Sequence, residues 1–279
     1  MGGTPRECFV LNAEPRKGEV AAVVLAAGRS RRFAGPVVKQ LVRIDGQPLV
    51  RRTARLALDA GLVTSVVVGH EAEAVAVAVA DLPLQRVDNP DYGDGQSTSV
   101  VAGLRSLGPE IAAALFVPID QPRLEAELLR RLVTAWRQGT GTIVAPMADG
   151  RRGAPVLFDR CHFDELLGLS GDTGGRQVIA RHPEALATVD ATAEQLEDLD
   201  NHEDLARWRA RHESQPPPLA DDDFYLDPNG LMVFTREYHL RRGFCCKSGC
   251  LHCPWGYRKK APRPALPDDF EIVVRTKTG

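Results

Sequence analysis

The sequence has no apolar run that approaches the roughly 20 residues needed to span a bilayer, and it carries little net charge. Its 35 Lys and Arg residues nearly balance 37 Asp and Glu residues, which leaves a formal net charge of -2. No overall attraction to nucleic acid or to a membrane surface is therefore expected. Residues 1–20 mix basic and acidic side chains and lack the apolar core of a signal peptide. These absences predict a cytoplasmic protein.

Short apolar runs alternate with helical patterns along the first two thirds of the chain. Buried strands are predicted at residues 20–26, 63–68, 115–119 and 142–145, and helices at residues 48–60, 71–80, 98–107 and 123–137. This alternation predicts an α/β fold with three layers, α/β/α, around a mostly parallel, Rossmann-like sheet. Ligands of such sheets bind at the carboxyl ends of the strands.

The composition changes near residue 214. Residues 214–223 (SQPPPLADDD) hold three prolines and three aspartates, which predicts a linker. The chain is therefore expected to contain one α/β domain at residues 19–213 and a small C-terminal cysteine-rich module with a tail at residues 224–279.

A loop of small and basic residues follows the first predicted strand. The small residues that allow backbone N–H groups to approach an anion are Ala26, Ala27 and Gly28, and the cations are Arg29, Arg31, Arg32 and Lys39. The loop matches neither GxxxxGK[ST] nor GxGxxG, which weakens the P-loop and dinucleotide interpretations. A nucleoside triphosphate needs both donors and cations, so the loop is a candidate triphosphate site. A solvated basic turn is the structural alternative.

The order of further motifs resembles the MobA-like nucleotidyltransferases, which include molybdenum cofactor cytidylyl- and guanylyltransferases and sugar-phosphate nucleotidyltransferases. The matching segments are LAAGRSRR (25–32), Lys39, VRIDGQPL (42–49), NPDYGDGQSTS (89–99), VPIDQP (117–122), RGAPVLF (152–158), GDTGGR (171–176) and DLDNHEDL (198–205). The resemblance covers residues 20–211. The Asp-Gln-Pro and Gly-Asp-x-Gly-x-Arg forms are typical of the cytidylyltransferase branch. Ala154 stands where that branch has a histidine, which leaves the acceptor open.

The resemblance implies roles for individual residues. For the nucleotide they are Leu25, Ala26, Ala27, Gly28, Lys39, Asp88, Ser97 and Ser99, and for catalysis Lys39, Arg29, Arg32 and Asp120. Magnesium would be held by Asp120 and Asp200, with Asp198 as the second choice, and an acceptor phosphate by Arg176. Ser97 is also expected to cap the helix that follows it. The structural alternatives are an N-cap at Asp120, a charged helix start at residues 198–204 and a surface salt bridge at Arg176.

The implied reaction joins a nucleoside monophosphate from an NTP to a phosphorylated acceptor and releases pyrophosphate. The motifs favour CTP and a molybdopterin-type acceptor, while sugar phosphates, isoprenoid precursors and phospholactate stay open. Mg²⁺ is the expected cofactor, because it prefers oxygen ligands and shares substrate phosphates. A protein that senses nucleotide without turnover, and docks a partner through its C-terminal module, is the alternative.

Four of the six cysteines lie between residues 245 and 253. Cys250 and Cys253 form a CxxC whose spacing lets both thiolates bind one metal. With Cys245, Cys246 or a histidine they predict a Zn²⁺ site, or, through all four cysteines, an iron–sulfur cluster. Reduced cysteines without metal are the alternative. Residues 225–257 resemble a small cysteine-rich bacterial module of uncharacterised function, which is a candidate surface for a protein partner.

Overall fold

The computed structural model describes residues 16–33, 38–212, 219–220, 222–242 and 248–257. The described residues fall into two compact units. The first contains residues 16–30 and 39–199, and the second contains residues 31–33, 38 and everything described from residue 200 onward. The linker at 214–223 and the domain limits expected from the sequence stay predictions.

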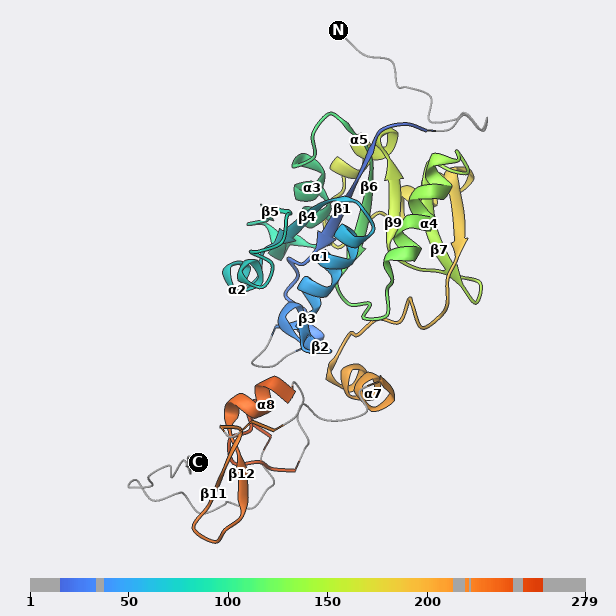
Figure 1. Cartoon of the computed structure of the whole chain (residues 1–279). Helices are drawn as coiled ribbons and strands as arrows, with labels where there is room; N and C mark the ends of the chain where they lie inside the picture. Colours follow the sequence, from blue (N-terminus) through green and yellow to red (C-terminus); the bar gives the residue numbers. More distant parts are fainter. Residues whose placement is uncertain (1–15, 34–37, 213–218, 221, 243–247, 258–279) are drawn as a thin grey trace. The chain divides into compact units, whose positions relative to one another are not determined.

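The first unit is built around one mixed, mostly parallel sheet of eight strands (Figure 1). The strand order is β10-β7-β9-β6-β1-β4-β5, and β8 pairs with β7. Only β9 and β8 run antiparallel to their neighbours. The strands are β1 (Glu19–Leu25), β4 (Val63–Val68), β5 (Gln85–Asp88), β6 (Ile111–Pro118), β7 (Ile143–Ala148), β8 (Arg151–Arg152), β9 (Val156–Asp159) and β10 (Leu186–Asp190).

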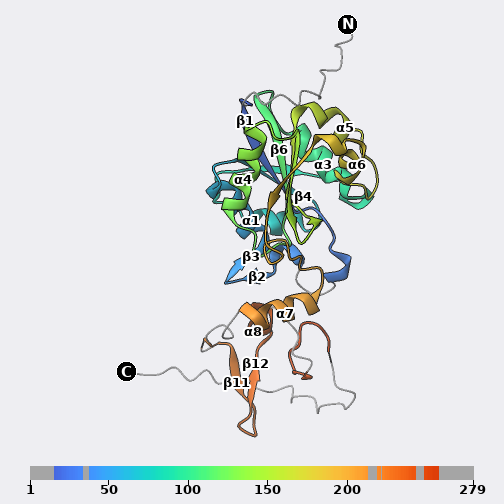
Figure 2. The same cartoon turned by 90° about the vertical axis from the view of Figure 1, so that its right-hand side faces the viewer.

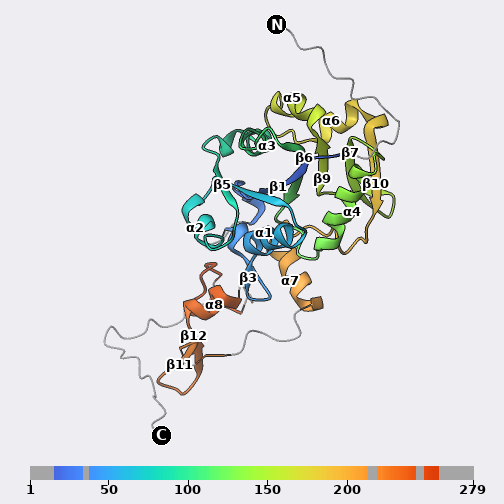
Figure 3. The same ribbon diagram turned by 45° about the horizontal axis from the view of Figure 1, so that its top comes forward.

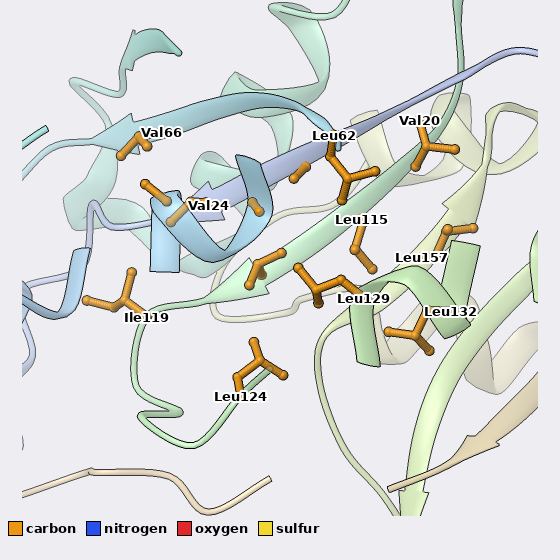
Figure 4. Close-up of a cluster of buried hydrophobic side chains, with 14 of the residues drawn as sticks. Val20, Val24, Leu62, Val66, Leu115, Ile119, Leu124, Leu129, Leu132 and Leu157 are labelled. Atoms are coloured by element: carbon orange, nitrogen blue, oxygen red, sulfur yellow. The ribbon is translucent and has the colours of Figure 1, made fainter. Parts of the chain in front are cut away.

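Helices cover both faces of this sheet (Figure 3). One face carries α1 (Leu49–Asp59), α2 (Ala72–Val77) and α4 (Ala126–Arg137), and the other carries α3 (Gln96–Arg105), α5 (Phe163–Leu167) and α6 (Arg176–Arg181). Each face has its own apolar core. The core under α1 and α4 includes Val24, Leu115 and Leu129 (Figure 4). The predicted three-layer α/β/α architecture is confirmed.

A small hairpin leads into α1. Its strands are β2 (Arg43–Ile44) and β3 (Gln47–Pro48), and the two residues between them, Asp45 and Gly46, both have positive φ angles of 49° and 75°. An Asp-Gly pair in this conformation suits a type I′ turn, whose twist matches that of the two strands. The Asp-Gly pair in the sequence IDGQPL therefore explains why the chain forms a hairpin here.

The second unit contains α7 (His202–His212), a hairpin of β11 (Phe224–Leu226) and β12 (Met232–Phe234), and α8 (Arg236–Arg242) (Figure 2). Phe234 from the hairpin stacks on the buried ring of Tyr238 from α8 at 4.4 Å between centroids. Across the described part of both units, no helix combines the length and the hydrophobicity that crossing a membrane requires.

Candidate nucleotide-binding site

The predicted triphosphate loop lies where the sheet changes direction. From the central strand β1 the chain builds β4 and β5 on one side, and then crosses to β6 on the other side. The carboxyl ends of β1 and β6 therefore lie side by side, with residues 26–30 following one strand and Asp120 following the other. Such a switch point is where open α/β sheets bind their ligands.

Three consecutive backbone carbonyls of the loop after β1 accept hydrogen bonds from other segments of the first unit. The buried amide of Gln40 donates its Nε2 hydrogens to the carbonyls of Ala26 and Gly28, at 3.0 and 2.6 Å. The carbonyl between them, on Ala27, accepts from the backbone N–H of His70 at 3.0 Å. Gly28 and Arg29 are exposed, and a Cβ added at Gly28 would meet nothing within 4 Å. The loop is thus anchored on its inner side and leaves room for a ligand at Gly28.

Lys39 and Asp120 form an ion pair at this edge of the sheet. The Nζ of Lys39 lies 2.8 Å from Oδ2 of Asp120, and the two side chains are 7% and 25% exposed. The other carboxylate oxygen of Asp120 has no hydrogen bond within the described residues. Removal of either side chain would leave the other charge without a close partner in a partly buried site, which is costly.

The residue after Asp120 connects it to the predicted second acid. Gln121 is buried, and its Nε2 donates to Oδ1 of the exposed Asp198 at 3.1 Å. The backbone N–H of Leu199 donates to the carbonyl of Asp120 at 2.8 Å. Two contacts thus hold residues 198–199 beside the end of β6. An oxygen donor set of this kind, with one unbonded carboxylate oxygen, suits a hard cation such as Mg²⁺.

The segment after β5 is built around a buried asparagine. The Nδ2 of Asn89 donates to the hydroxyls of Thr98 and Ser99 at 2.9 and 3.0 Å, and its Oδ1 accepts from the N–H of Asp91. These bonds fold residues 89–95 back onto the first turn of α3. Ser99 is therefore a buried structural hydroxyl, and its predicted contact with a nucleotide stays a prediction.

Ser97 does not cap α3, and that expectation was wrong. The helix begins at Gln96 with Gly95 as its N-cap residue and no side-chain cap. Ser97 lies inside the first turn, and its N–H and hydroxyl both donate to the carbonyl of Gly171, at 3.2 and 2.7 Å. The hydroxyl of Ser97 therefore acts as a donor to another segment, and not as an acceptor for the first N–H groups of α3. Ser97 thus joins the two segments predicted to hold nucleotide and acceptor.

Three other predicted site residues are solvent-exposed. Arg29 lies over the ring of Tyr92, with 5.2 Å from its guanidinium carbon to the ring centroid. Asp88 ends β5 and accepts from Arg86. Arg176 begins α6, directly after the loop that Ser97 contacts. Exposed cations at the carboxyl edge are available to phosphates, and their assignments stay predictions.

Arg32 and Asp200 both belong to the second unit, where they pair with each other. Nη1 of Arg32 lies 2.9 Å from Oδ2 of Asp200, and the backbone N–H of Asp200 donates to Asp204. Asp204 also accepts from the N–H of Asn201, so these acids organise the start of α7. The sharing of one magnesium by Asp120 and Asp200 stays a prediction.

The cysteine cluster is partly described. Cys250 and Cys253 are half-buried and joined by a hydrogen bond from the N–H of Cys253 to the carbonyl of Cys250, whereas Cys245 and Cys246 lie outside the described residues. His252, which lies between Cys250 and Cys253 in the sequence, forms a hydrogen bond with the hydroxyl of Tyr225 at 2.7 Å. His239 on α8 is 1% exposed, and neither ring nitrogen has a hydrogen-bond partner in the described part of the chain. Burial, with Arg242 and His252 adding to it, lowers the pKa of His239 to about 4.

Comparison with known proteins identifies the first unit. Residues 22–186 match the family described as the MobA-like NTP transferase domain, which is more than half of the chain. The chain belongs to the MobA-like NTP transferase family. Residues 214–259 of the same chain match a second family, DUF5522, whose function is unknown.

The curated relatives of this MobA-like chain are named after different activities. A bifunctional IPC transferase and DIPP synthase of Rubrobacter xylanophilus is 41% identical over 118 residues, which cover 40% of this chain and 27% of that protein. Nicotine blue oxidoreductase of Paenarthrobacter nicotinovorans is 31% identical over 199 residues, 67% of this chain and 95% of that one. The chain spans about a third or less of the length of the first curated relatives that it matches.

A solved structure shares the MobA-like fold at moderate identity. Rv0371c from Mycobacterium tuberculosis aligns with a TM-score of 0.61 and 27% identity over 68% of this chain and 97% of its own. Another structure of Rv0371c, in complex with manganese, aligns with a TM-score of 0.59 and 25% identity over the same shares. The nucleotidyltransferase relationship predicted from the motifs is confirmed at the level of the family.

Two residues of the MobA-like site were not predicted from the sequence. Gln40 holds the loop that is predicted to bind a triphosphate, and Tyr92 lies against Arg29. Tyr92 stands inside the segment that was singled out, but no pattern marks it for contact with an arginine. Gln40 follows Lys39 directly, and only its burial in the folded chain reveals its function. Both residues act on neighbours that are distant in sequence, which is why spacing does not reveal them.

Proposed function

We propose that the first unit transfers a nucleoside monophosphate from an NTP to a phosphorylated acceptor and releases pyrophosphate. The observation that carries the proposal is the ion pair of Lys39 and Asp120 at the switch point, beside the loop that Gln40 holds. The pair supplies a cation for phosphate oxygens and a carboxylate for a metal ion. Membership of the NTP transferase family supports the same reaction class.

In this reaction an anionic phosphate oxygen of the acceptor forms a bond to the α-phosphorus of the NTP. The bond from that phosphorus to the bridging oxygen of the β-phosphate breaks, and pyrophosphate leaves with the electron pair. The nucleophile already carries its charge, so no strong general base is required. Catalysis then depends on alignment and on charge stabilisation by groups already in place.

Each group has a task in this scheme. The loop at Gly28 receives the β- and γ-phosphates through backbone N–H groups, and Lys39 and Arg29 offset their charge. Asp120, with Asp198, would hold Mg²⁺, which neutralises developing charge on the α-phosphate and the leaving oxygens when bound. The manganese complex of Rv0371c supports a divalent cation in this fold. Arg32 as a catalytic residue and Asp200 as a magnesium ligand rest on the family resemblance.

The acceptor is proposed to meet the loop at residues 171–175 and Arg176. This loop contacts the start of α3 through Ser97, so acceptor and nucleotide segments are joined. The Asp-Gln-Pro and Gly-Asp-x-Gly-x-Arg motifs favour CTP and a molybdopterin-type acceptor. Because Ala154 stands where the cytidylyltransferase branch has a histidine, other phosphorylated acceptors should be tested as well.

The C-terminal unit is proposed to hold a structural metal through its cysteines, as Zn²⁺ or as an iron–sulfur cluster. The support is the CxxC of Cys250 and Cys253, together with a small unit in which few side chains are fully buried. Metal binding commonly stabilises modules of this size. Metal analysis of the purified full chain, with and without Cys250→Ser and Cys253→Ser, tests this assignment.

A pyrophosphate-release screen tests the proposed reaction. Four NTPs are combined with molybdopterin, sugar phosphates, isoprenoid phosphates and phospholactate, in the presence of Mg²⁺. Asp120→Asn is expected to abolish release with every pair while the far-ultraviolet spectrum stays unchanged. Asp190→Asn is the matched control, because Asp190 is likewise at the carboxyl end of a parallel strand but belongs to the edge strand β10. If the protein binds a nucleotide but releases no pyrophosphate with any acceptor, the proposed transferase activity is wrong and the nucleotide-sensor hypothesis is favoured.

A further inference from the structure

Three metal-binding side chains meet at the edge of the sheet opposite to the nucleotide site. His162, Glu165 and His182 place ligand atoms within 4.8 Å of one another. His162 follows β9, which runs antiparallel to β6, and Asp159 at the end of β9 pairs with Ala113 near the start of β6. The cluster therefore lies where the parallel strands begin. Glu165 lies in α5, His162 directly precedes α5 and His182 directly follows α6, and Figure 2 shows these two helices side by side at that end.

We propose that this cluster binds one divalent transition-metal ion of the Zn²⁺ type and joins the two helices. The ligands are Nδ1 of His162, Oε2 of Glu165 and Nε2 of His182. Two imidazoles and one carboxylate are a donor set for zinc and its neighbours, and not for Mg²⁺ or Ca²⁺. Zinc ligands lie about 3.3 Å apart around the metal, given bonds of ~2.0–2.1 Å, so the three donors need to close by at most about 1.5 Å.

Each of the two histidines has a polar partner close to the nitrogen that is not proposed to bind the metal. Nε2 of His162 bonds to the buried hydroxyl of Thr142 at 2.8 Å, while its Nδ1 has no hydrogen bond among the described residues. Nδ1 of His182 lies 3.7 Å from a carboxylate oxygen of Glu184. Histidines that bind metals usually direct their second nitrogen to such a partner.

The carboxylate is oriented in the same way. Oε1 of Glu165 accepts from Arg181 at 2.6 Å, which leaves Oε2 beside Nε2 of His182 at 2.7 Å. On binding one metal, these two atoms would move apart by about 0.6 Å, to the roughly 3.3 Å between neighbouring zinc ligands. Binding of a metal would replace the single His182 to Glu165 hydrogen bond.

The metal would close residues 162–182 into a loop. This stretch contains α5, the loop at 168–175 and α6, which begins at Arg176. The carbonyl of Gly171 in the middle of the loop accepts from Ser97. A metal ion bound to residues at both ends of this stretch would therefore restrict the movement of the loop that contacts the start of α3. This structural function is independent of the reaction proposed above.

The test is metal stoichiometry of the full chain carrying Cys250→Ser and Cys253→Ser, so that binding by the cysteine module is reduced. The protein is stripped with a chelator and titrated with Co²⁺ and Zn²⁺. We expect one bound ion, a cobalt spectrum without thiolate charge-transfer bands, and a rise in Tm on adding Zn²⁺. His182 and Glu165 both have partly exposed side chains. The variants His182→Asn and Glu165→Gln should each fail to bind the ion and should show no rise in Tm on adding Zn²⁺.

His70→Asn serves as the matched control, because His70 lies near Tyr92 at the nucleotide edge and is expected to change neither result. The metal-free circular dichroism spectrum confirms that each variant folds. If the His182→Asn variant retains the ion, or the parent protein binds none, the cluster is an ion-paired network only and the proposal fails.

Discussion

Gln40 determines the shape of the triphosphate loop, although it does not face the predicted ligand. Its amide bonds to two loop carbonyls, and its Oε1 is buried without a partner among the described residues. Gln40→Leu removes two hydrogen bonds of about 1 kcal/mol each and also removes the unpaired oxygen, so we expect a net loss of about 1–2 kcal/mol. Urea unfolding measures this loss, and nucleotide titration should show a weaker Kd. Gln47→Leu, on the exposed end of the hairpin, should leave both unchanged within about 0.5 kcal/mol.

Lys39 is expected to act mainly on the reaction rate. Its ammonium is the one nearly buried cation that touches Asp120 among the described residues, so Lys39→Met leaves the carboxylate and the reacting phosphates without it. Removal of one such preorganised donor typically lowers kcat by about 10²–10³. Steady-state pyrophosphate release with saturating NTP measures the change. Arg51→Met breaks an exposed pair with Asp81 and is the control. Equal losses in both variants would show that Lys39 acts through stability alone.

At the scale of the element, the strongly apolar segments were predictable and the weakly apolar ones were not. The expected strands at residues 20–26, 63–68, 115–119 and 142–145 correspond to β1, β4, β6 and β7, whose residues are almost all buried. The strands β5 and β10 lie at the two edges of the sheet and are half exposed, so they lack a long apolar run. The antiparallel direction of β9 is set by its neighbours and has no signature in the sequence.

The same limit applies to the site. Asp120 and Lys39 belong to motifs, so both could be identified before folding. The bond from Ser97 to Gly171 joins residues 74 positions apart, and local propensity predicts a cap instead. Tertiary contact overrides local preference at this position, as it does at Gln40.

Gly95 lies at the contact between the start of α3 and the loop at residues 171–175, which is proposed to meet the acceptor. Its φ is 120°, and a Cβ there would lie 2.3 Å from the backbone carbon and oxygen of Gly171. Gly95→Ala must therefore strain the backbone and push the loop at 171–175 away, for a combined loss of about 3 kcal/mol in urea unfolding. Gly46→Ala is the control, since Gly46 has a φ of 75° with nothing within 4 Å of the added atom, and it should cost about 1 kcal/mol. If the two variants lose equal stability, the contact with Gly171 contributes nothing.

At the scale of the whole molecule, the two units should respond differently to acid, and His239 is the reason. Its pKa is about 4 in the folded chain, because burial disfavours the charged ring, against about 6.5 in an unfolded chain. Between these two values only the unfolded state binds the proton. The second unit should therefore lose stability as pH falls from about 6.5 to about 4, with no further loss from this group below that range.

Amide hydrogen exchange resolves this effect because it reports each segment separately. Protection of β11, β12 and α8 should decrease between pH 7 and pH 5, after correction for the intrinsic exchange rate. In His239→Phe, which keeps an aromatic ring and cannot be protonated, protection of these three elements should be the same at both values. His70→Asn lies in the first unit and should preserve the wild-type pH response of the second. If protection in the wild type does not change with pH, the pKa of His239 is not lowered in the folded chain and the prediction is wrong.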